Sequence, residues 1–156
     1  MTIEELAARQ AIVDLIHAYC FHFDQNEPHE VAALFTDSAT VDYGPETETI
    51  VGAGSIADTI AVGLERTFAA TSHHVSNVQV RFDGPERAES VCYLYAWHRY
   101  RDGSPDGHLW GRYHHRFERT DAGWRISALV LRAAGTVDFH RGTMHPTGRR
   151  SGRPEL

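Results

Sequence analysis

Asp24 is the residue whose type and position most clearly suggest chemistry. On a helical period of 3.6 residues it lies one turn beyond Cys20, on the apolar side of the segment from Thr2 to Asp24 that also carries Leu6, Val13, Ile16 and Phe23. An ionised carboxylate buried without a partner costs several kcal/mol. Asp24 is therefore expected to be paired, protonated or lining a polar cavity. The eleven histidines of the chain make an imidazole the natural partner.

Two neighbouring histidines, His73 and His74, are candidates for that partner. They lie at the start of a segment with β-strand character, and the alternative is a surface pair without a role. A histidine held by a carboxylate at one ring nitrogen and open at the other can act as a general base near neutral pH. Strict alternation with Val78, Val80 and Phe82 would place His74 inside, whereas a single β-bulge would place His73 there.

Three further polar side chains could complete a pocket. His98 continues a small-residue strand face that could line a cavity, although a hydrogen-bonded core histidine would fit the same pattern. Tyr19 and Tyr43 have hydroxyls that could hold a ligand oxygen or water, and packing alone would also explain either. The other histidines lack the regular spacing of metal ligands, so no metal site is expected.

The elements that must position these residues follow from changes in periodicity. Helices are predicted for 2–24, where Thr2 and Glu5 form a capping box, for 28–35, and for 55–68 with Ser55 near its cap. Asp37-Ser38 should end the second helix before a short strand over 39–43. Alternating segments at 75–82, 88–100, 109–119 and 124–131, separated by turn residues, predict four successive antiparallel strands. The order predicts an α+β domain in which three N-terminal helices pack on a curved antiparallel sheet that encloses a pocket.

Composition sets the remaining expectations. The 156 residues suit one domain, which we place at 1–135, and the Gly-, Pro- and Arg-rich end at 136–156 is expected to be a loosely structured arm or an oligomer contact. A net charge of −6 argues against nucleic acid, and no apolar run approaches a membrane span. The acidic, amphipathic start differs from a secretory signal, so a cytoplasmic location is expected. Nucleotide-binding, hydrolase and zincin motifs are absent from the sequence.

Five stretches, in this order and spacing, resemble the SnoaL-like branch of the nuclear transport factor 2-like superfamily over roughly residues 3–130. They are 19–24 (YCFHFD), 35–43 (FTDSATVDY), 71–77 (TSHHVSN), 97–100 (WHRY) and 111–125, which begins GRY and ends GWR. The similar mechanistic types are scytalone dehydratase, hexachlorocyclohexane dehydrochlorinase and bile acid 7α-dehydratase. The resemblance implies a cone-shaped sheet and a homodimer or homotrimer.

Residue by residue, the resemblance places the family's catalytic Asp and His on Asp24 and His73, which decides provisionally against His74. A second histidine falls on His98, and a tyrosine that polarises a substrate carbonyl through water falls on Tyr43. Tyr19 matches a tyrosine of the bile acid dehydratase pattern, where the dehydrochlorinase has a lysine. The chain departs from scytalone dehydratase at Phe23, which replaces a tyrosine, and at Gly111 and Tyr113, which replace a Ser and Asn pair, so scytalone itself is not the expected substrate.

The resulting hypothesis is a cofactor-free lyase of the dehydratase type that acts on a hydrophobic cyclic small molecule. His73 would remove a proton beside a carbonyl, Asp24 would orient it, Tyr43 would stabilise the enolate, and Tyr19 or His98 would protonate the departing oxygen. The substrate is expected to contact His98, Phe23, Tyr113 and Asn77. An isomerase or polyketide cyclase could use the same dyad, and a non-catalytic module that binds a small ligand or a protein is the alternative of another class.

Overall fold

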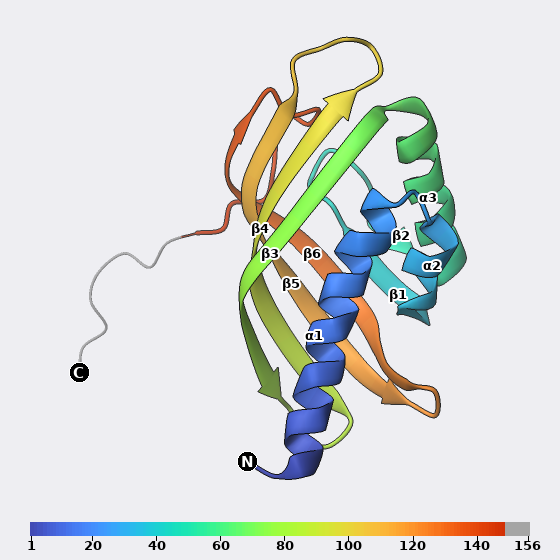
Figure 1. Cartoon of the computed structure of the whole chain (residues 1–156), viewed down its shortest axis with the longest axis vertical. Coiled ribbons are helices and arrows are strands. Elements are labelled where there is room, and N and C mark those ends of the chain that lie inside the picture. Colours follow the sequence, from blue (N-terminus) through green and yellow to red (C-terminus); the bar gives the residue numbers. More distant parts are fainter. Residues whose placement is uncertain (149–156) are drawn as a thin grey trace, which may run out of the picture.

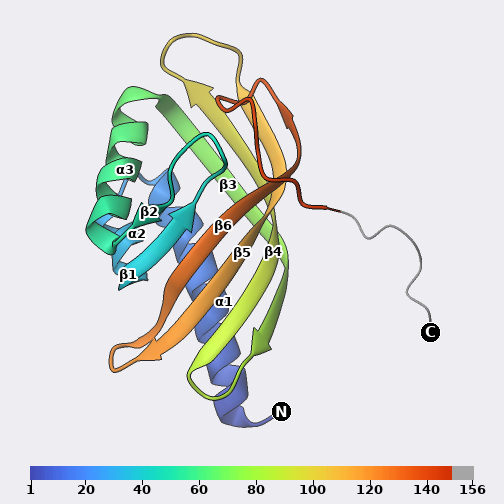
Figure 2. The ribbon, with the colours of Figure 1, turned by 180° about the vertical axis from the view of Figure 1, so that it is seen from behind.

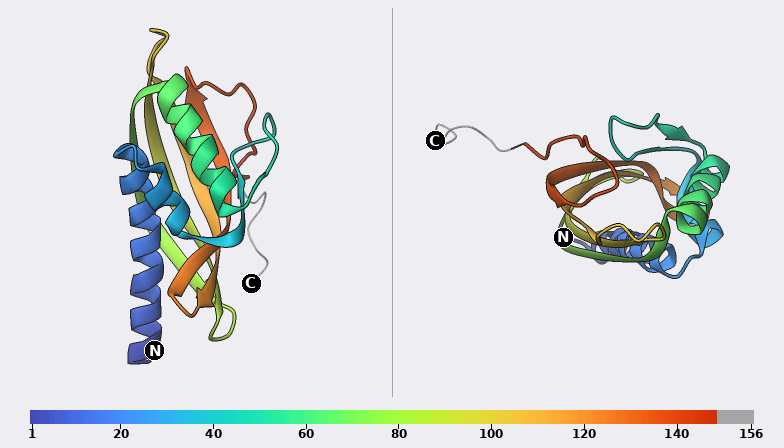
Figure 3. Two further views of the ribbon diagram at one scale, coloured as in Figure 1. Left: turned by 90° about the vertical axis from the view of Figure 1, so that its right-hand side faces the viewer. Right: turned by 90° about the horizontal axis from the view of Figure 1, so that it is seen from above.

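The computed structural model describes residues 1–148, in which helices cover one side of a strongly curved sheet (Figures 1 and 2). The elements follow in the order α1 (Ile3–Asp24), α2 (Pro28–Ala33), β1 (Phe35–Asp42), β2 (Ile50–Val51), α3 (Ala53–Arg66), β3 (Phe68–Phe82), β4 (Arg87–Tyr100), β5 (Gly107–Thr120) and β6 (Gly123–Val137). The six strands form one sheet in the order β2-β1-β6-β5-β4-β3, whose edges do not close (Figure 3). The predicted α+β class with its curved sheet is confirmed.

Helix α1 begins where the sequence predicts. The Thr2 hydroxyl accepts the Glu5 N–H at 3.1 Å, and the Glu5 carboxylate accepts the Thr2 N–H at 2.7 Å, which completes the capping box. The buried face of the helix consists of Ile12, Ile16, Tyr19, Cys20 and Phe23. Leu6 was expected on this face but is exposed. None of the helices among residues 1–148 combines the length and apolarity needed to cross a bilayer.

Strand β1 corrects two predictions about the region after α2. Asp37-Ser38 does not end a helix; it lies within β1, which starts at Phe35. The strand accommodates this polar pair in an irregularity, because five steps along β1 from Phe35 to Thr40 correspond to two steps along β6. Strand β1 also pairs parallel with β6, whereas the other pairings in the sheet are antiparallel. The sheet is therefore mixed rather than wholly antiparallel.

Helix α3 starts two residues earlier than predicted. Its N-cap is Gly52, which has a φ of 95°, and Ser55 is not the cap. A positive φ at this position favours glycine because it has no Cβ. The buried residues Ile56, Ala57, Ile60 and Leu64 confirm the predicted inner face, while Phe68 is already the first residue of β3.

A β-bulge in β3 decides which of the paired histidines faces inward. His73 lies opposite Ala96 and Val75 opposite Leu94, but beyond the bulge Val80 lies opposite Ser90. Strand β3 thus contains one extra residue between Ser76 and Gln79, and Asn77 in this stretch has a φ of 53°. Because side chains alternate across a strand, one extra residue reverses which of them point inward. His73 therefore shares the inner face with Val78 and Val80, and His74 is exposed.

Strand β6 extends six residues beyond the predicted end at Leu131, so the boundary at residue 135 falls inside it. The following segment, residues 138–148, returns along the end of the sheet beside the β1–β2 connection (Figure 2). The Glu46 carboxylate accepts the Thr143 N–H at 2.6 Å, and His145 Nε2 lies 3.0 and 3.1 Å from the two Asp42 carboxylate oxygens. Residues 136–148 are thus bound to the domain rather than loosely structured. The remainder of the predicted arm, 149–156, lies outside the described residues.

Candidate active site

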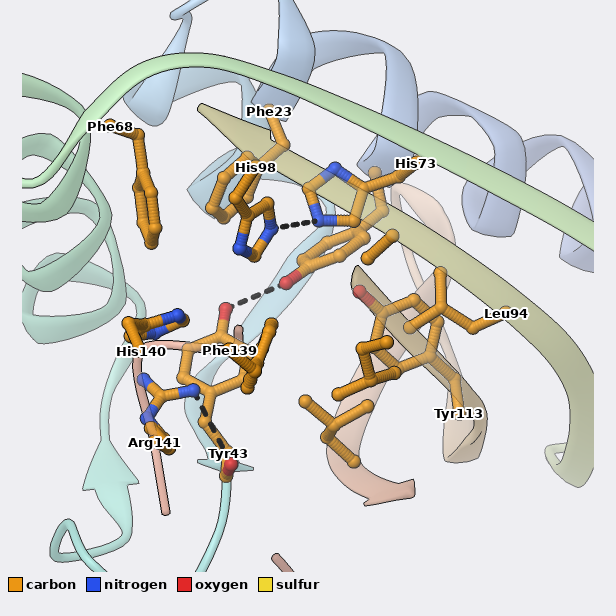
Figure 4. Close-up of a pocket in the computed structure, with 14 residues that line it drawn as sticks. Phe23, Tyr43, Phe68, His73, Leu94, His98, Tyr113, Phe139, His140 and Arg141 are labelled. Carbon is orange, nitrogen blue, oxygen red and sulfur yellow. Dashed lines mark hydrogen bonds between the residues drawn. The ribbon is translucent and has the colours of Figure 1, made fainter. Parts of the chain in front are cut away.

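A pocket opens between α1, the sheet and the segment that follows β6 (Figure 4). Its wall is mostly apolar and aromatic, with a few polar groups that point into it. The lining residues are Tyr19, Phe23, Tyr43, Phe68, His73, Leu94, Ala96, His98, Leu109, Tyr113, Leu131, Phe139, His140 and Arg141. This composition, apolar with a small number of converging polar groups, is typical of small-molecule sites.

Asp24 and His73 form a close pair. His73 Nδ1 lies 2.6 Å from Asp24 Oδ1, which also accepts the Thr71 hydroxyl at 2.8 Å. Asp24 Oδ2 accepts the backbone N–H of His73 at 2.8 Å. The last residue of α1 is thus joined to β3 by three hydrogen bonds, and the His73 side chain is only 5% exposed. These contacts hold the imidazole in one orientation.

Opposing effects act on the Asp24 carboxyl. Burial raises its pKa, but the hydrogen bonds and charge of His73 and the hydrogen bond from Thr71 outweigh burial, so the pKa is lowered overall. Asp24 is therefore ionised at neutral pH and can only accept hydrogen bonds. In the neutral imidazole this holds the proton of His73 on Nδ1, and the lone pair of Nε2 then faces the pocket.

His98 lies beside this lone pair. Its Nε2 is 3.5 Å from His73 Nε2, and its ring stacks on Phe139 with centroids 5.3 Å apart (Figure 4). Burial is the main cause that lowers the pKa of His98 to about 2, and electrostatic interactions with His73, His140 and Arg141 act in the same direction. His98 is thus a neutral ring. Its buried Nδ1 has no hydrogen-bond partner among residues 1–148.

Tyr19 and Tyr43 share a short hydrogen bond. Their hydroxyl oxygens are 2.6 Å apart, and the Tyr113 ring packs edge-on against Tyr19. Burial raises the pKa of Tyr43 to about 12, although the hydrogen bond with Tyr19 and the charge of Arg141 oppose it, and burial raises the pKa of Tyr19 as well. Both phenols are protonated at neutral pH. One hydroxyl donates to the other, which leaves one O–H of the pair for a ligand oxygen.

Two positions where the sequence departs from the scytalone dehydratase pattern are Phe23, which lines the pocket, and Gly111, which lies outside the lining. Phe23 packs edge-on against the His73 imidazole, with centroids 4.9 Å apart, and has no hydroxyl to offer. At Gly111, a Cβ added to the backbone would lie 2.2 Å from the backbone oxygen of Arg132. The close approach of β6 therefore excludes a side chain at Gly111, so a Ser cannot replace it without moving the backbone.

Most predicted site residues converge on this pocket. Its lining includes His73, Tyr19, Tyr43, His98, Phe23 and Tyr113, and Asp24 lies behind His73. Asn77 is a correction: it is exposed at the β3 bulge and does not line the pocket. Asn77 was named as a substrate contact because it ends the stretch 71–77 that resembles the family.

Sequence reasoning missed several lining residues, and those with aromatic or charged side chains are Phe68, Phe139, His140 and Arg141. Phe68 was assigned to a helix, and the other three were assigned to the arm. A signal was present in the consecutive Phe, His and Arg at 139–141, because an aromatic residue followed by two basic ones stands out in a Gly- and Pro-rich segment. Among residues 1–148, no group of three or more His, Cys, Asp and Glu side chains is arranged to hold a metal ion.

Comparisons with known proteins agree with this architecture. A family model described as a SnoaL-like domain matches residues 4–130. No sequence among the curated proteins matches the chain. Among solved structures, a protein of Novosphingobium aromaticivorans described as a candidate scytalone dehydratase is 33% identical, with a TM-score of 0.89 over 97% of this chain and 100% of that one.

Two more distant structures show the same fold. The LinA-type3 hexachlorocyclohexane dehydrochlorinase of Novosphingobium barchaimii is 19% identical, with a TM-score of 0.81 over 92% of this chain and 98% of that one. Rv3472(D26N) of Mycobacterium tuberculosis, described as of unknown function, is 19% identical, with a TM-score of 0.71 over 83% and 73% of the two chains. The family model and the 33% identical structure show that the chain belongs to the SnoaL-like family of the nuclear transport factor 2-like superfamily.

Proposed function

We propose that this protein is a lyase of the dehydratase type that removes a proton next to a carbonyl of a hydrophobic cyclic small molecule. The observation that carries the proposal is the 2.6 Å contact of His73 Nδ1 with Asp24, together with the position of His73 in the pocket lining. A carboxylate that holds one imidazole nitrogen and leaves the other open is the arrangement of a general base. The candidate scytalone dehydratase at 33% identity supports this reaction type.

In the proposed reaction, His73 Nε2 takes a proton from the carbon beside the substrate carbonyl. The electrons of the broken C–H bond move into the carbonyl, giving an enolate, and the charged His73 ring is stabilised by Asp24. The free O–H of the Tyr19 and Tyr43 pair donates to the enolate oxygen, directly or through water. Preorganised donors of this kind contribute roughly 10²–10³ in rate.

The second step expels the leaving hydroxyl. The enolate electrons form the carbon–carbon double bond as the C–O bond breaks, and the departing hydroxide receives a proton from Tyr19 or His98 to become water. The charged His73 then returns the proton that it took from carbon to that residue, so the enzyme is restored and the products are the unsaturated ketone and one water. The neutral state of His98 leaves an N–H that can donate to the departing oxygen. No cofactor is required, because the carbonyl of the substrate accepts the electrons.

An isomerase or a polyketide cyclase would begin with the same proton removal and differs only in the fate of the enolate. A binding module is favoured less, because ligand binding alone does not require a carboxylate behind an imidazole. The distant dehydrochlorinase has the same fold, and Tyr19 in this pocket supports a hydroxyl leaving group over chloride.

The first test measures proton removal without assuming a leaving group. Cyclic ketones such as 1-tetralone are incubated in D₂O, and exchange of the hydrogens beside the carbonyl is followed by proton NMR. We expect the wild type to accelerate exchange, His73→Gln to lower the rate by roughly 10²–10⁴, and His74→Gln to leave it unchanged, since general bases contribute about that much. His74 is the matched control because it is adjacent and exposed.

Cyclic β-hydroxy ketones then test the leaving group, with the ultraviolet absorbance of the conjugated product as the readout. Exchange without dehydration would favour the isomerase or cyclase. No exchange with any cyclic ketone, or equal rates in wild type and His73→Gln, would refute the lyase and move the binding module ahead.

A further inference from the structure

Arg141 places a positive charge at the pocket opposite the catalytic pair. It belongs to the segment after β6, and Figure 4 shows its guanidinium beside Tyr43 and His140. Its side chain is half-buried. Nothing in the proposed reaction uses this group.

The contacts of Arg141 leave most of its hydrogen-bonding capacity unused. One terminal nitrogen lies 3.5 Å from the backbone oxygen of Tyr43, and the guanidinium carbon is 5.5 Å from the centre of the Tyr43 ring. A guanidinium has five N–H donors in a planar fork. Within residues 1–148 it forms no salt bridge. The nearby Glu46 carboxylate instead accepts the Thr143 N–H.

The pocket contains no negative charge to balance this cation. None of the residues that line it is an Asp or a Glu. Asp24 lies behind His73 and is engaged by Thr71 and His73. Because burial of a guanidinium without a partner is unfavourable, an anion that enters the pocket would offset that cost.

Arg141 is also held in place before any ligand arrives. The contacts of Thr143 with Glu46 and of His145 with Asp42 attach its segment to the end of β1 and the following loop. Because the backbone that carries Arg141 is already held, binding does not have to order this segment, which favours affinity. A planar guanidinium also matches a carboxylate with two parallel hydrogen bonds.

We propose that Arg141 binds a carboxylate of the substrate, so that the substrate is a hydrophobic cyclic carbonyl compound that also carries an acid group. This inference rests on the proposed function for the reaction and names the class of molecule that undergoes it. The acid would anchor at Arg141, the ring would lie against the apolar wall, and the reacting carbon would face His73. Arg141 is thus a specificity-determining residue.

Binding of matched probes tests the inference without requiring turnover. The probes are 4-fluorobenzoate and 4-fluorobenzamide, and the bicyclic pair 6-fluoro-2-naphthoate and its amide, with binding followed by fluorine NMR at neutral pH. We expect the wild type to bind each carboxylate at least about tenfold more tightly than its amide, in line with a charged hydrogen-bonded pair. Arg141→Met should remove this preference, and Arg141→Lys should retain part of it.

Arg116→Met is the matched control, because Arg116 lies exposed on β5 and does not line the pocket. It should bind the probes like the wild type, and a two-dimensional NMR spectrum checks that each variant is folded. Absence of carboxylate binding to the wild type, equal affinity for acid and amide, or an unchanged preference in Arg141→Met would overturn the inference. His73→Gln separates the two proposals, since it should slow exchange of ketone hydrogens and keep the preference for carboxylates.

Discussion

Replacing Asp24 by Asn tests the central contact of the site, because the change is nearly isosteric and removes only the charge and one acceptor. In the wild type, the carboxylate accepts from the Thr71 hydroxyl, from the His73 backbone and from His73 Nδ1. An amide retains one oxygen and presents an NH₂ group. If that group faces His73, it donates to Nδ1 and moves the imidazole proton to Nε2. The base would then have no lone pair in the pocket.

The magnitudes follow from these three contacts. Hydrogen bonds to a charged group contribute about 1.5–3 kcal/mol each, against about 0.5–1.5 for neutral ones. The variant loses one of these hydrogen bonds and weakens the other two. This loss of stability is partly offset because the variant no longer buries a charge. We expect Asp24→Asn to lower the free energy of unfolding by about 1–3 kcal/mol at pH 7. The rate of ketone hydrogen exchange should fall by roughly 10²–10⁴.

The stability loss should depend on pH in a defined direction. The pKa of Asp24 in the folded protein is lowered below its value of about 3.9 in the unfolded chain. Its contribution is therefore fully present above about pH 4 and is lost as the pH falls through the folded pKa. Urea unfolding of wild type and variant should give a difference that is constant from pH 5 to 7 and smaller at pH 3.

Asp14→Asn is the control, since Asp14 is exposed on the same helix. It should change neither exchange nor the pH dependence. If Asp24→Asn kept its exchange rate within about threefold of wild type, the role assigned to the pair would be wrong. A stability difference that grew toward acid pH would refute the electrostatic reasoning.

Three further predictions concern other parts of the site and the fold. His73→Gln should raise the pKa of the Asp24 carboxyl, because the hydrogen bond and charge of His73 lower it in the wild type, and a carbon-13 NMR titration that showed no rise would count against their coupling. Gly111→Ser should lower the free energy of unfolding by about 2 kcal/mol or more, because the added Cβ would clash with the backbone of Arg132. A urea unfolding curve indistinguishable from that of the wild type would contradict this. We also propose that the protein forms a homodimer or homotrimer, because Tyr93 and Trp110 are 47% and 48% exposed on the outer face of the sheet. Trp110→Glu should shift the sedimentation coefficient toward that of the monomer. A wild type that sediments as a monomer would refute the proposal.

Local periodicity was sufficient to predict the helical half of the fold and one member of the Asp24–His73 pair. The capping box at Thr2, the apolar face of α1 and the inner face of α3 depend on residues within a few positions of one another. Asp24 was identified for the same reason, since a carboxylate that follows Cys20 on a buried helical face is conspicuous without any tertiary information. Simple alternation also predicted the inner face of β4, which consists mostly of small residues and includes His98.

The choice between His73 and His74 needed the tertiary structure. Alternation alone favoured His74, and the resemblance to SnoaL-like proteins favoured His73. The bulge between Ser76 and Gln79 resolves this, because the register of β3 is set by its pairing with β4 and not by its own residues. The same bulge places Asn77 at the surface, away from the pocket where it was expected.

The periodicity of the sequence alone was enough to predict the α+β class and a carboxylate on a buried helical face that requires a partner. Only the tertiary structure could decide the parallel pairing of β1 with β6 and the return of residues 139–141 to the pocket, because both depend on contacts between segments far apart in the chain. Periodicity shows which side of a helix or strand is apolar. Strand register and the path of a connecting segment depend instead on the other elements against which that side packs. Arg141, at the end of a segment with little periodicity, could be assigned to the site only after folding had brought it beside Tyr43.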